Sequence, residues 1–111
     1  MQPIQIVRGT TLNIGVALFD QSGNPVELDT GDILRFGVKK QPDDTEYLIV
    51  KTTSTLVADN YVFALGPSDT ASLDFARYFY DIGLQTGSDY YMVVECSYFD
   101  VTPNITAIVV E

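Results

Sequence analysis

The chain has 111 residues, a length that suits one domain, residues 1–111, around a single hydrophobic core. Apolar residues make up 46% of it, and no apolar run approaches the roughly 20 residues of a transmembrane helix. Fifteen acidic residues against six basic ones give a net charge of −9, which repels nucleic-acid phosphates and either keeps the protein soluble or complements a basic surface on a protein partner. We therefore expect a folded domain that binds neither nucleic acid nor membrane.

Histidine is missing, and Cys96 is the only cysteine. The usual general base and the commonest zinc ligand are thus not available, although lysine-, carboxylate- or tyrosine-based catalysis stays open. A lone cysteine excludes an internal disulfide, and we expect Cys96 to be buried beside Met92 and Val94. The start, MQPIQ, lacks the basic and apolar regions of a secretory signal, so we expect none.

The first half of the chain predicts short strands between dense turn signals. Residues 3–7 indicate an edge strand, and residues 12–19 alternate with the period of a half-buried strand. Turn residues fill 20–25 and 29–32. Further strands are predicted by the apolar residues at Leu34, Phe36 and Val38, within residues 47–51, and at Tyr61, Phe63 and Leu65.

The second half predicts a short helical turn near residues 67–73 and then a long hairpin over residues 76–101. In its first strand Tyr78, Tyr80 and Ile82 share the inward face, while Phe79 and Asp81 face outward. In its second strand we expect an inward face formed by Tyr90, Met92, Val94 and Cys96. Because Phe99 and Val101 continue the core out of phase with Cys96, we expect a β-bulge near Ser97 and Tyr98.

The tail ITAIVV, residues 105–110, is apolar at nearly every position and indicates a last strand, buried here or against a neighbouring chain. With it, about seven to nine short strands and almost no helix predict an immunoglobulin-like antiparallel β-sandwich. The spacing of Leu73, Ala76, Tyr78 and Tyr80 also resembles a tyrosine corner, in which a phenol ties a crossover to the next strand.

Two carboxylate clusters have ordinary explanations. Residues 20–24, with Asp29 and Asp32, contain oxygen ligands for calcium, but the same residue types build hairpin turns and no closing glutamate follows. Asp43, Asp44 and Glu46 lie in a polar loop, where solvation is the expected state. We therefore expect no catalytic, cofactor-binding or metal-binding residues and no cofactor.

The aromatic residues of the hairpin cannot all face the core, because neighbours in a strand point in opposite directions. Outward aromatic side chains are frequent anchors of protein contacts, and they also serve as platforms on which sugars stack. We expect a surface that meets a partner along the outer side of the hairpin and the tail: Phe79, Asp81, Tyr91, Tyr98, Ile105, Ile108 and Val110.

Several segments resemble, in order, the N-terminal domain of phage baseplate upper proteins and related small phage and prophage structural proteins: RGTT at 8–11, LFDQSGNPVEL, FGVKK, PSDTASL and ARYFYDIGLQTGSDYYMVVECSYFDVTPNIT. The resemblance covers essentially the whole chain. Two residues depart from the family pattern, Thr10 in place of aspartate and Ala76 in place of glycine. Ala76 suggests a corner without positive φ.

This resemblance implies an immunoglobulin-like virion building block without enzymatic activity, which docks onto another baseplate or tail protein or assembles with copies of itself. Its implied location is the virion, or the bacterial cytoplasm when a prophage expresses it. A carbohydrate-binding or adhesion sandwich that uses exposed tyrosines is the alternative.

Overall fold

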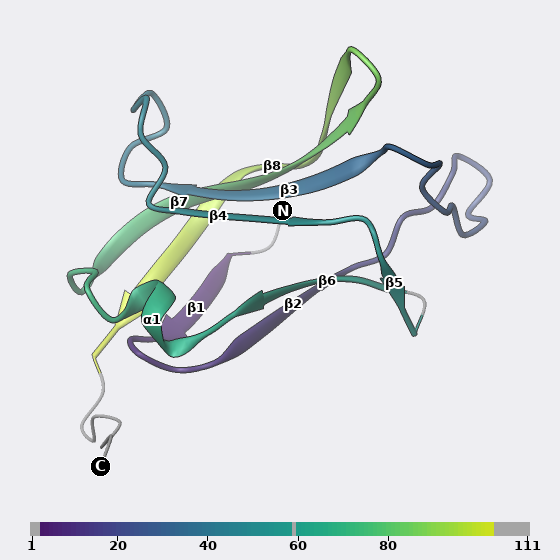
Figure 1. Cartoon of the computed structure of the whole chain (residues 1–111). Coiled ribbons are helices and arrows are strands. Elements are labelled where there is room, and N and C mark those ends of the chain that lie inside the picture. Colours follow the sequence, from purple (N-terminus) through teal and green to yellow (C-terminus); the bar gives the residue numbers. More distant parts are fainter. Residues whose placement is uncertain (1–2, 59, 104–111) are drawn as a thin grey trace.

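The computed structural model describes residues 3–58 and 60–103. Over these residues the chain forms eight strands and one short helix, arranged as two facing sheets (Figure 1). The elements are β1 (Ile4–Val7), β2 (Leu12–Val16), β3 (Ile33–Lys39), β4 (Ile49–Thr53), β5 (Leu56–Val57), β6 (Asn60–Leu65), α1 (Pro67–Thr70), β7 (Ala76–Thr86) and β8 (Asp89–Thr102). The predicted all-β sandwich is confirmed.

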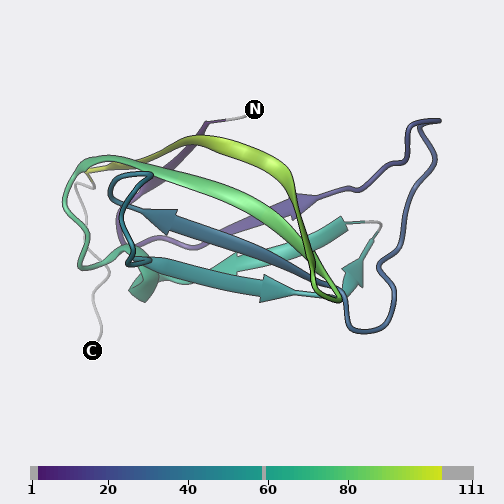
Figure 2. The same ribbon diagram turned by 90° about the horizontal axis from the view of Figure 1, so that it is seen from above.

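The larger sheet has the strand order β1-β8-β7-β3-β4, and Figure 2 shows β8, β7, β3 and β4 side by side. At its centre lies the predicted hairpin of β7 and β8. β3 pairs antiparallel with β7, and β4 pairs antiparallel with β3. At the other edge β1 runs parallel to β8, with Ile4 opposite Phe99. The sheet is therefore mixed, whereas the sequence pattern predicted antiparallel pairing throughout.

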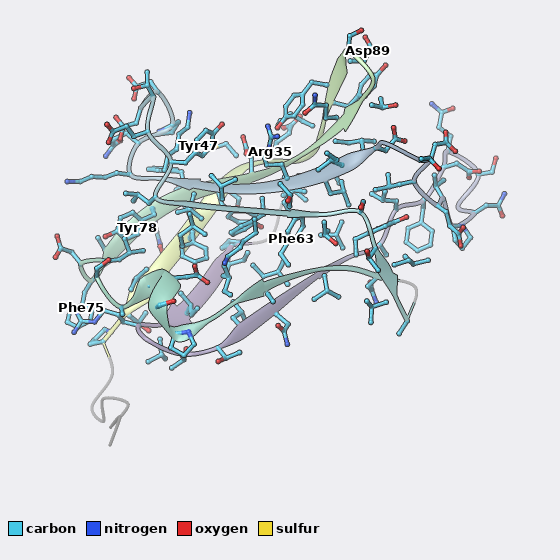
Figure 3. All side chains as sticks on the ribbon, viewed as in Figure 1. Arg35, Tyr47, Phe63, Phe75, Tyr78 and Asp89 are labelled. Atoms are coloured by element: carbon cyan, nitrogen blue, oxygen red, sulfur yellow. The ribbon has the colours of Figure 1, made fainter. Side chains whose placement is uncertain are left out.

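The smaller sheet has the order β2-β6-β5, and the core lies between the two sheets. The alternating strands bury the residues that their period predicts, including Leu34, Phe36 and Val38 on β3. Phe36 lies at the centre of an aromatic cluster, with ring centroids 5.7 Å from Phe63, 5.5 Å from Tyr80 and 6.1 Å from Phe99. Figure 3 shows Phe63 between the sheets.

The crossover from β6 to β7 is fixed by α1 and by the predicted tyrosine corner. The hydroxyl of Tyr78 donates a 2.9 Å hydrogen bond to the carbonyl of Asp74, which ties the crossover to the start of β7. The fully buried Thr70 accepts a 2.8 Å hydrogen bond from the amide of Gly9, whose φ of +76° few other residues tolerate. The kink after β1 is thereby attached to the helix.

The register of β8 against β7 shifts twice, and these shifts correct the predicted facing of β8. Tyr80 pairs with Ser97, Ile82 with Val94, and Gly83 with Met92, so β8 carries an extra residue in each interval. Each shift reverses which face of the sheet the side chains on its N-terminal side occupy. After both shifts, the side chains of β8 again alternate in phase with Phe99 and Val101. The bulges thus lie between Met92 and Ser97, on the N-terminal side of the predicted position.

Three residues of the predicted inward face of β8 are therefore exposed. Cys96 is a free, exposed thiol, and the prediction that it is buried is wrong. Tyr90 and Met92 are 50% and 46% exposed, whereas Val94, between the two bulges, packs partly against the core. The end of the hairpin near Asp89 also bends away from the smaller sheet, so no described strand of that sheet covers it (Figures 1 and 3).

The carboxylate of Asp20 accepts 2.9 Å hydrogen bonds from the amides of Ser22 and Asn24, as expected for a turn. Within the part of the chain that the structure describes, no group of three or more His, Cys, Asp or Glu side chains could hold a metal ion. Nor does any helix there have the length and apolar character needed to cross a membrane. The tail, residues 105–110, lies outside the described residues.

Candidate functional site

The candidate site lies on the outer face of the larger sheet, the face turned away from β2, β5 and β6. Strand register brings outward positions of β3, β7 and β8 together there, with Gly37 opposite Asp81 and Phe79 opposite Tyr98. Figure 3 shows Arg35 and Tyr47 on this side of the sheet. We call the group the outer-face site: Arg35, Gly37, Lys39, Tyr47, Phe79, Asp81, Gly83, Tyr90 and Tyr98.

Two glycines let two tyrosine rings lie directly on the sheet. A Cβ at Gly37 would come within 2.7 Å of Cε1 of Tyr47, and a Cβ at Gly83 would collide with the hydroxyl of Tyr90. A glycine inside a strand commonly marks such a close approach, and an aromatic ring then covers the exposed backbone. Tyr90 covers Gly83 so well that the glycine is buried. Tyr47 thus lies on the strand position opposite Asp81, and Tyr90 lies two residues further along β7.

Asp81 is a half-buried carboxylate beside these two rings. Burial raises its pKa, and the positive charge of Lys39 opposes that shift. The pKa of Tyr90 is also raised, first by burial, then by the negative charge of Asp81 and by Tyr47, while Arg35 acts in the opposite direction. The carboxylate, the two phenols and the two cations therefore form one electrostatic group.

Phe79 and Tyr98 form the second aromatic part of the site, across the β7–β8 pair. Their ring centroids are 5.7 Å apart with the planes inclined by 56°. The guanidinium of Arg77 lies 4.1 Å from the centroid of the Tyr98 ring and makes a two-pronged contact with Asp100, at 2.9 and 3.2 Å. The ion pair thus holds a cation against the Tyr98 ring.

Two hollows flank Phe79. The smaller, of about 90 Å³, is lined by Gly37, Lys39, Pro42, Tyr47, Phe79, Tyr80, Asp81 and Cys96. The larger, of about 330 Å³, is lined by Pro3, Phe79, Cys96, Ser97 and Tyr98. The smaller hollow lies below the roughly 300–1,000 Å³ of typical small-molecule sites, but it has room for the head group of one side chain.

Of the residues predicted to meet a partner, Phe79, Asp81 and Tyr98 are brought together on the outer face. Tyr91 is not among them, because it pairs with Leu84 and so shares the opposite face of the sheet, where it is 56% exposed. Its predicted facing is wrong for the same reason as that of Cys96, the double shift in β8. Ile105, Ile108 and Val110 lie outside the described residues.

Sequence reasoning missed Tyr47, Tyr90 and the cation Lys39, whose Nζ lies 4.6 Å from the centroid of the Tyr47 ring. A signal for the two tyrosines was present. Gly37 and Gly83 occupy outward positions in otherwise regular strands, and such glycines indicate that a large side chain crosses over the backbone. The sequence does not specify which tyrosine covers which glycine.

The chain matches no protein-family model, and comparison with curated proteins and with solved structures finds no significant match.

Proposed function

We propose that the protein is a non-catalytic structural module of a phage or prophage virion, of the baseplate or tail type, that docks onto another virion protein through the outer-face site. The phage assignment rests on the order of sequence segments that resemble baseplate upper proteins. The docking surface rests on one observation, the half-buried Asp81 carboxylate framed by aromatic rings on an open sheet face.

The surroundings of Asp81 suit a cationic side chain from a basic partner. A carboxylate gives charge-assisted hydrogen bonds to an arginine or lysine head group, and neighbouring tyrosine rings add cation–π attraction. Burial already disfavours the charged form of Asp81, so a further cation would relieve that penalty. Lys39 partly fulfils this role in the free protein, from its position over Tyr47.

The charge of the whole protein supports the same kind of partner. A net charge of −9 attracts a basic surface and accelerates its encounter. The aromatic rings then supply apolar contact, since Tyr90 and Tyr98 are 50% and 43% exposed. Charge therefore favours approach, and the outer-face site supplies the local fit.

Carbohydrate binding, the alternative, needs a ring face that is open to a sugar. Arg77 lies over the ring of Tyr98, Lys39 lies over that of Tyr47, and Tyr90 rests on Gly83. A partner's cation can take the place of Lys39 over Tyr47, whereas a stacked sugar would displace that cation without replacing its charge, so these contacts favour a protein partner. A glycan array with wild-type protein and the variants Tyr91→Ala and Tyr98→Ala tests the alternative, which requires a glycan that the wild type retains and a variant loses.

The proposal is tested by following the protein into particles. The gene is expressed with its native neighbours, with an epitope tag inserted in the exposed turn after Ser22, and particles are purified on a density gradient. We expect wild-type protein in the particle fraction. Asp81→Lys places a cation where we expect the partner's cation, so the particle-bound amount should fall at least about tenfold.

Glu27→Lys is the matched control, because it makes the same charge change in an exposed connection far along the chain. It should leave the particle-bound amount within about twofold of wild type. Wild-type protein that is missing from the particles would overturn the virion assignment. Equal incorporation of Asp81→Lys and wild type would overturn the outer-face site as the docking surface.

A further inference from the structure

The two sheets separate along one side of the sandwich, where a groove opens between β2 and β8. β1 pairs only with the last part of β8, Phe99–Thr102, so the earlier part of β8 has no strand beside that edge within the described ranges. β2 is the first strand in the order β2-β6-β5, and its outer edge is also without a neighbouring strand among the described residues. Two strand edges therefore face the same opening.

The groove has a volume of about 530 Å³ and reaches the core. Ile14 of β2 lines it from the smaller sheet, and Ile4 of β1 with Val93 and Val94 of β8 line it from the larger sheet, all half-buried. Tyr80 and Ile82, only 4% and 2% exposed, also border it. Apolar side chains of both sheets thus border a space that no described segment fills.

An extended apolar segment is the occupant that such a groove suits. Unpaired strand edges offer backbone hydrogen bonds to an added strand, and the apolar lining offers contacts to alternate side chains of that strand. A compact ligand would use the lining but leave the backbone edges without partners. The β2 edge is the more regular of the two, because the β8 edge is interrupted by two bulges.

Residues 105–110 of the chain, ITAIVV, have the required composition. Five of these six residues are β-branched, no charge interrupts them, and six residues in a strand span about 20 Å. That length matches the five-residue strand β2. The segment can therefore pair along the whole of β2 and present alternate apolar side chains to the groove.

The segment of the same copy cannot fill the whole groove. Thr102 pairs with Val7, three residues or about 10 Å from the groove border at Ile4, whereas the opposite border lies on β8 near Val94. Eight residues of β8 separate Val94 from Thr102, which is about 26 Å at strand spacing. The seven residues from 104 to 110 span at most about 25 Å, so they can enter the groove near Ile4 but cannot extend along it as far as Val94.

We infer that residues 105–110 of one copy add as a strand to β2 in the groove of a second copy. Each copy then donates one strand and accepts one, so the contact is head-to-tail and yields rings or open chains. This assembly uses a different surface from the outer-face site. It stands whether or not docking at Asp81 does.

The test measures the mass of the protein of residues 1–111 over a range of concentrations by sedimentation and light scattering. We expect wild type to associate as its concentration rises. Ile108→Asp places a charge within the donated strand, and it should raise the association midpoint at least about tenfold. Ser54→Asp adds the same charge to the exposed connection between β4 and β5 and should leave the midpoint unchanged.

Mixing two defective variants identifies the donor and the acceptor. Val94→Asp, folded according to circular dichroism, keeps the tail but places a charge in the groove, and Ile108→Asp keeps the groove but has a defective tail. Each variant alone should be monomeric. In the mixture the intact tail of Val94→Asp can enter the intact groove of Ile108→Asp, so the two variants should form dimers with one copy of each. If Val94→Asp does not fold, Ile4→Asp at the groove border replaces it in the mixture.

A wild-type protein that stays monomeric at every concentration would overturn the inference. So would association that Ile108→Asp leaves unchanged, because the contact would then lie elsewhere. Asp81→Lys should associate like wild type. A loss of association in that variant would indicate that the copies contact each other through the outer-face site, and this result would also contradict the inference.

Discussion

The two faces of the larger sheet carry aromatic residues from the same strands but use them differently. On the inner face Phe36, Tyr80 and Phe99 pack against one another and are almost completely buried. On the outer face Tyr47 and Tyr90 lie over glycines, and Arg77 lies over Tyr98. Neighbouring residues of β7 and β8 face opposite sides of the sheet. The inner aromatic rings therefore pack against other rings, whereas the outer rings contact backbone and charged groups.

This difference indicates which aromatic residues are available for binding. The inner rings cannot leave their neighbours without opening a cavity in the core. The outer rings lie on backbone or beside cations and are partly exposed, so a partner can contact their exposed sides without opening a cavity in the core. The face of the sheet on which an aromatic residue lies therefore distinguishes the residues that maintain the fold from those that we propose to contact a partner.

The largest expected effect comes from removing the central inner ring. Phe36→Ala should lower the free energy of unfolding by about 3–5 kcal/mol, because Phe36 is fully buried and contacts three other rings. Phe79→Ala on the outer face should lower it by about 1 kcal/mol or less. Urea denaturation measures both, and equal losses would contradict the separation of the two faces.

Gly83→Ala should break the packing of an outer ring while the core stays intact. The added Cβ would occupy the position of the Tyr90 hydroxyl, so the ring must move, at about 1 kcal/mol. Because burial is the main cause of the raised pKa of Tyr90, that pKa should fall toward its ordinary value. An ultraviolet or NMR titration of the tyrosines measures the change.

Gly15→Ala is the control for this substitution. Gly15 also lies within a strand, and a Cβ there would meet the atoms of Asn60 at an ordinary 3.7 Å. We expect its free energy of unfolding to stay within about 0.5 kcal/mol of wild type, with the tyrosine titration unchanged. If Gly15→Ala shifted the titration as strongly as Gly83→Ala, the contact between Tyr90 and Gly83 would not be the cause.

Tyr78→Phe removes one hydrogen bond and no ring. The carbonyl of Asp74 then loses the 2.9 Å bond that ties the crossover to β7, and the free energy of unfolding should fall by about 1 kcal/mol. Tyr98→Phe on the outer face should change it by less than about 0.5 kcal/mol. Thermal unfolding of both variants tests this, and a larger loss from Tyr98→Phe would show that its hydroxyl has a structural role.

Much of the fold follows from local sequence patterns. The period of two in β3, β6 and β7 identifies their buried faces, and the turn residues around Gly87 locate the hairpin. The spacing of Tyr78 from the crossover predicts the corner that Asp74 completes. These features depend on residues close together in the chain, which is why a single sequence contains them.

The remainder depends on how distant segments meet. The double shift in β8 follows from its register against β7, and the parallel partner of β1 follows from a crossover between sheets. For the candidate site, alternation predicts that Phe79 and Asp81 face outward, but only the packing brings Tyr47 over Gly37 beside them. A pattern within one strand cannot specify a loop side chain that crosses over another strand.

The smallest expected effect concerns the charge of Asp81. Its pKa is raised by burial, so the folded state binds a proton more readily than the unfolded state, and stability falls as pH rises through this range. An asparagine side chain at this position cannot ionise and avoids this loss. Asp81→Asn should therefore be slightly more stable than wild type at pH 7, with the difference disappearing below the unfolded pKa of about 3.9.

Glu27→Gln removes the same charge from an exposed position and so separates the effect of burial from that of net charge. Relief of general repulsion would make both variants more stable to a similar degree at pH 7. A local penalty would stabilise Asp81→Asn alone, and urea denaturation at pH 7 and pH 3 distinguishes the two. If Asp81→Asn is more stable but is no longer incorporated into particles, the carboxylate lowers the stability of the free protein and is needed for docking.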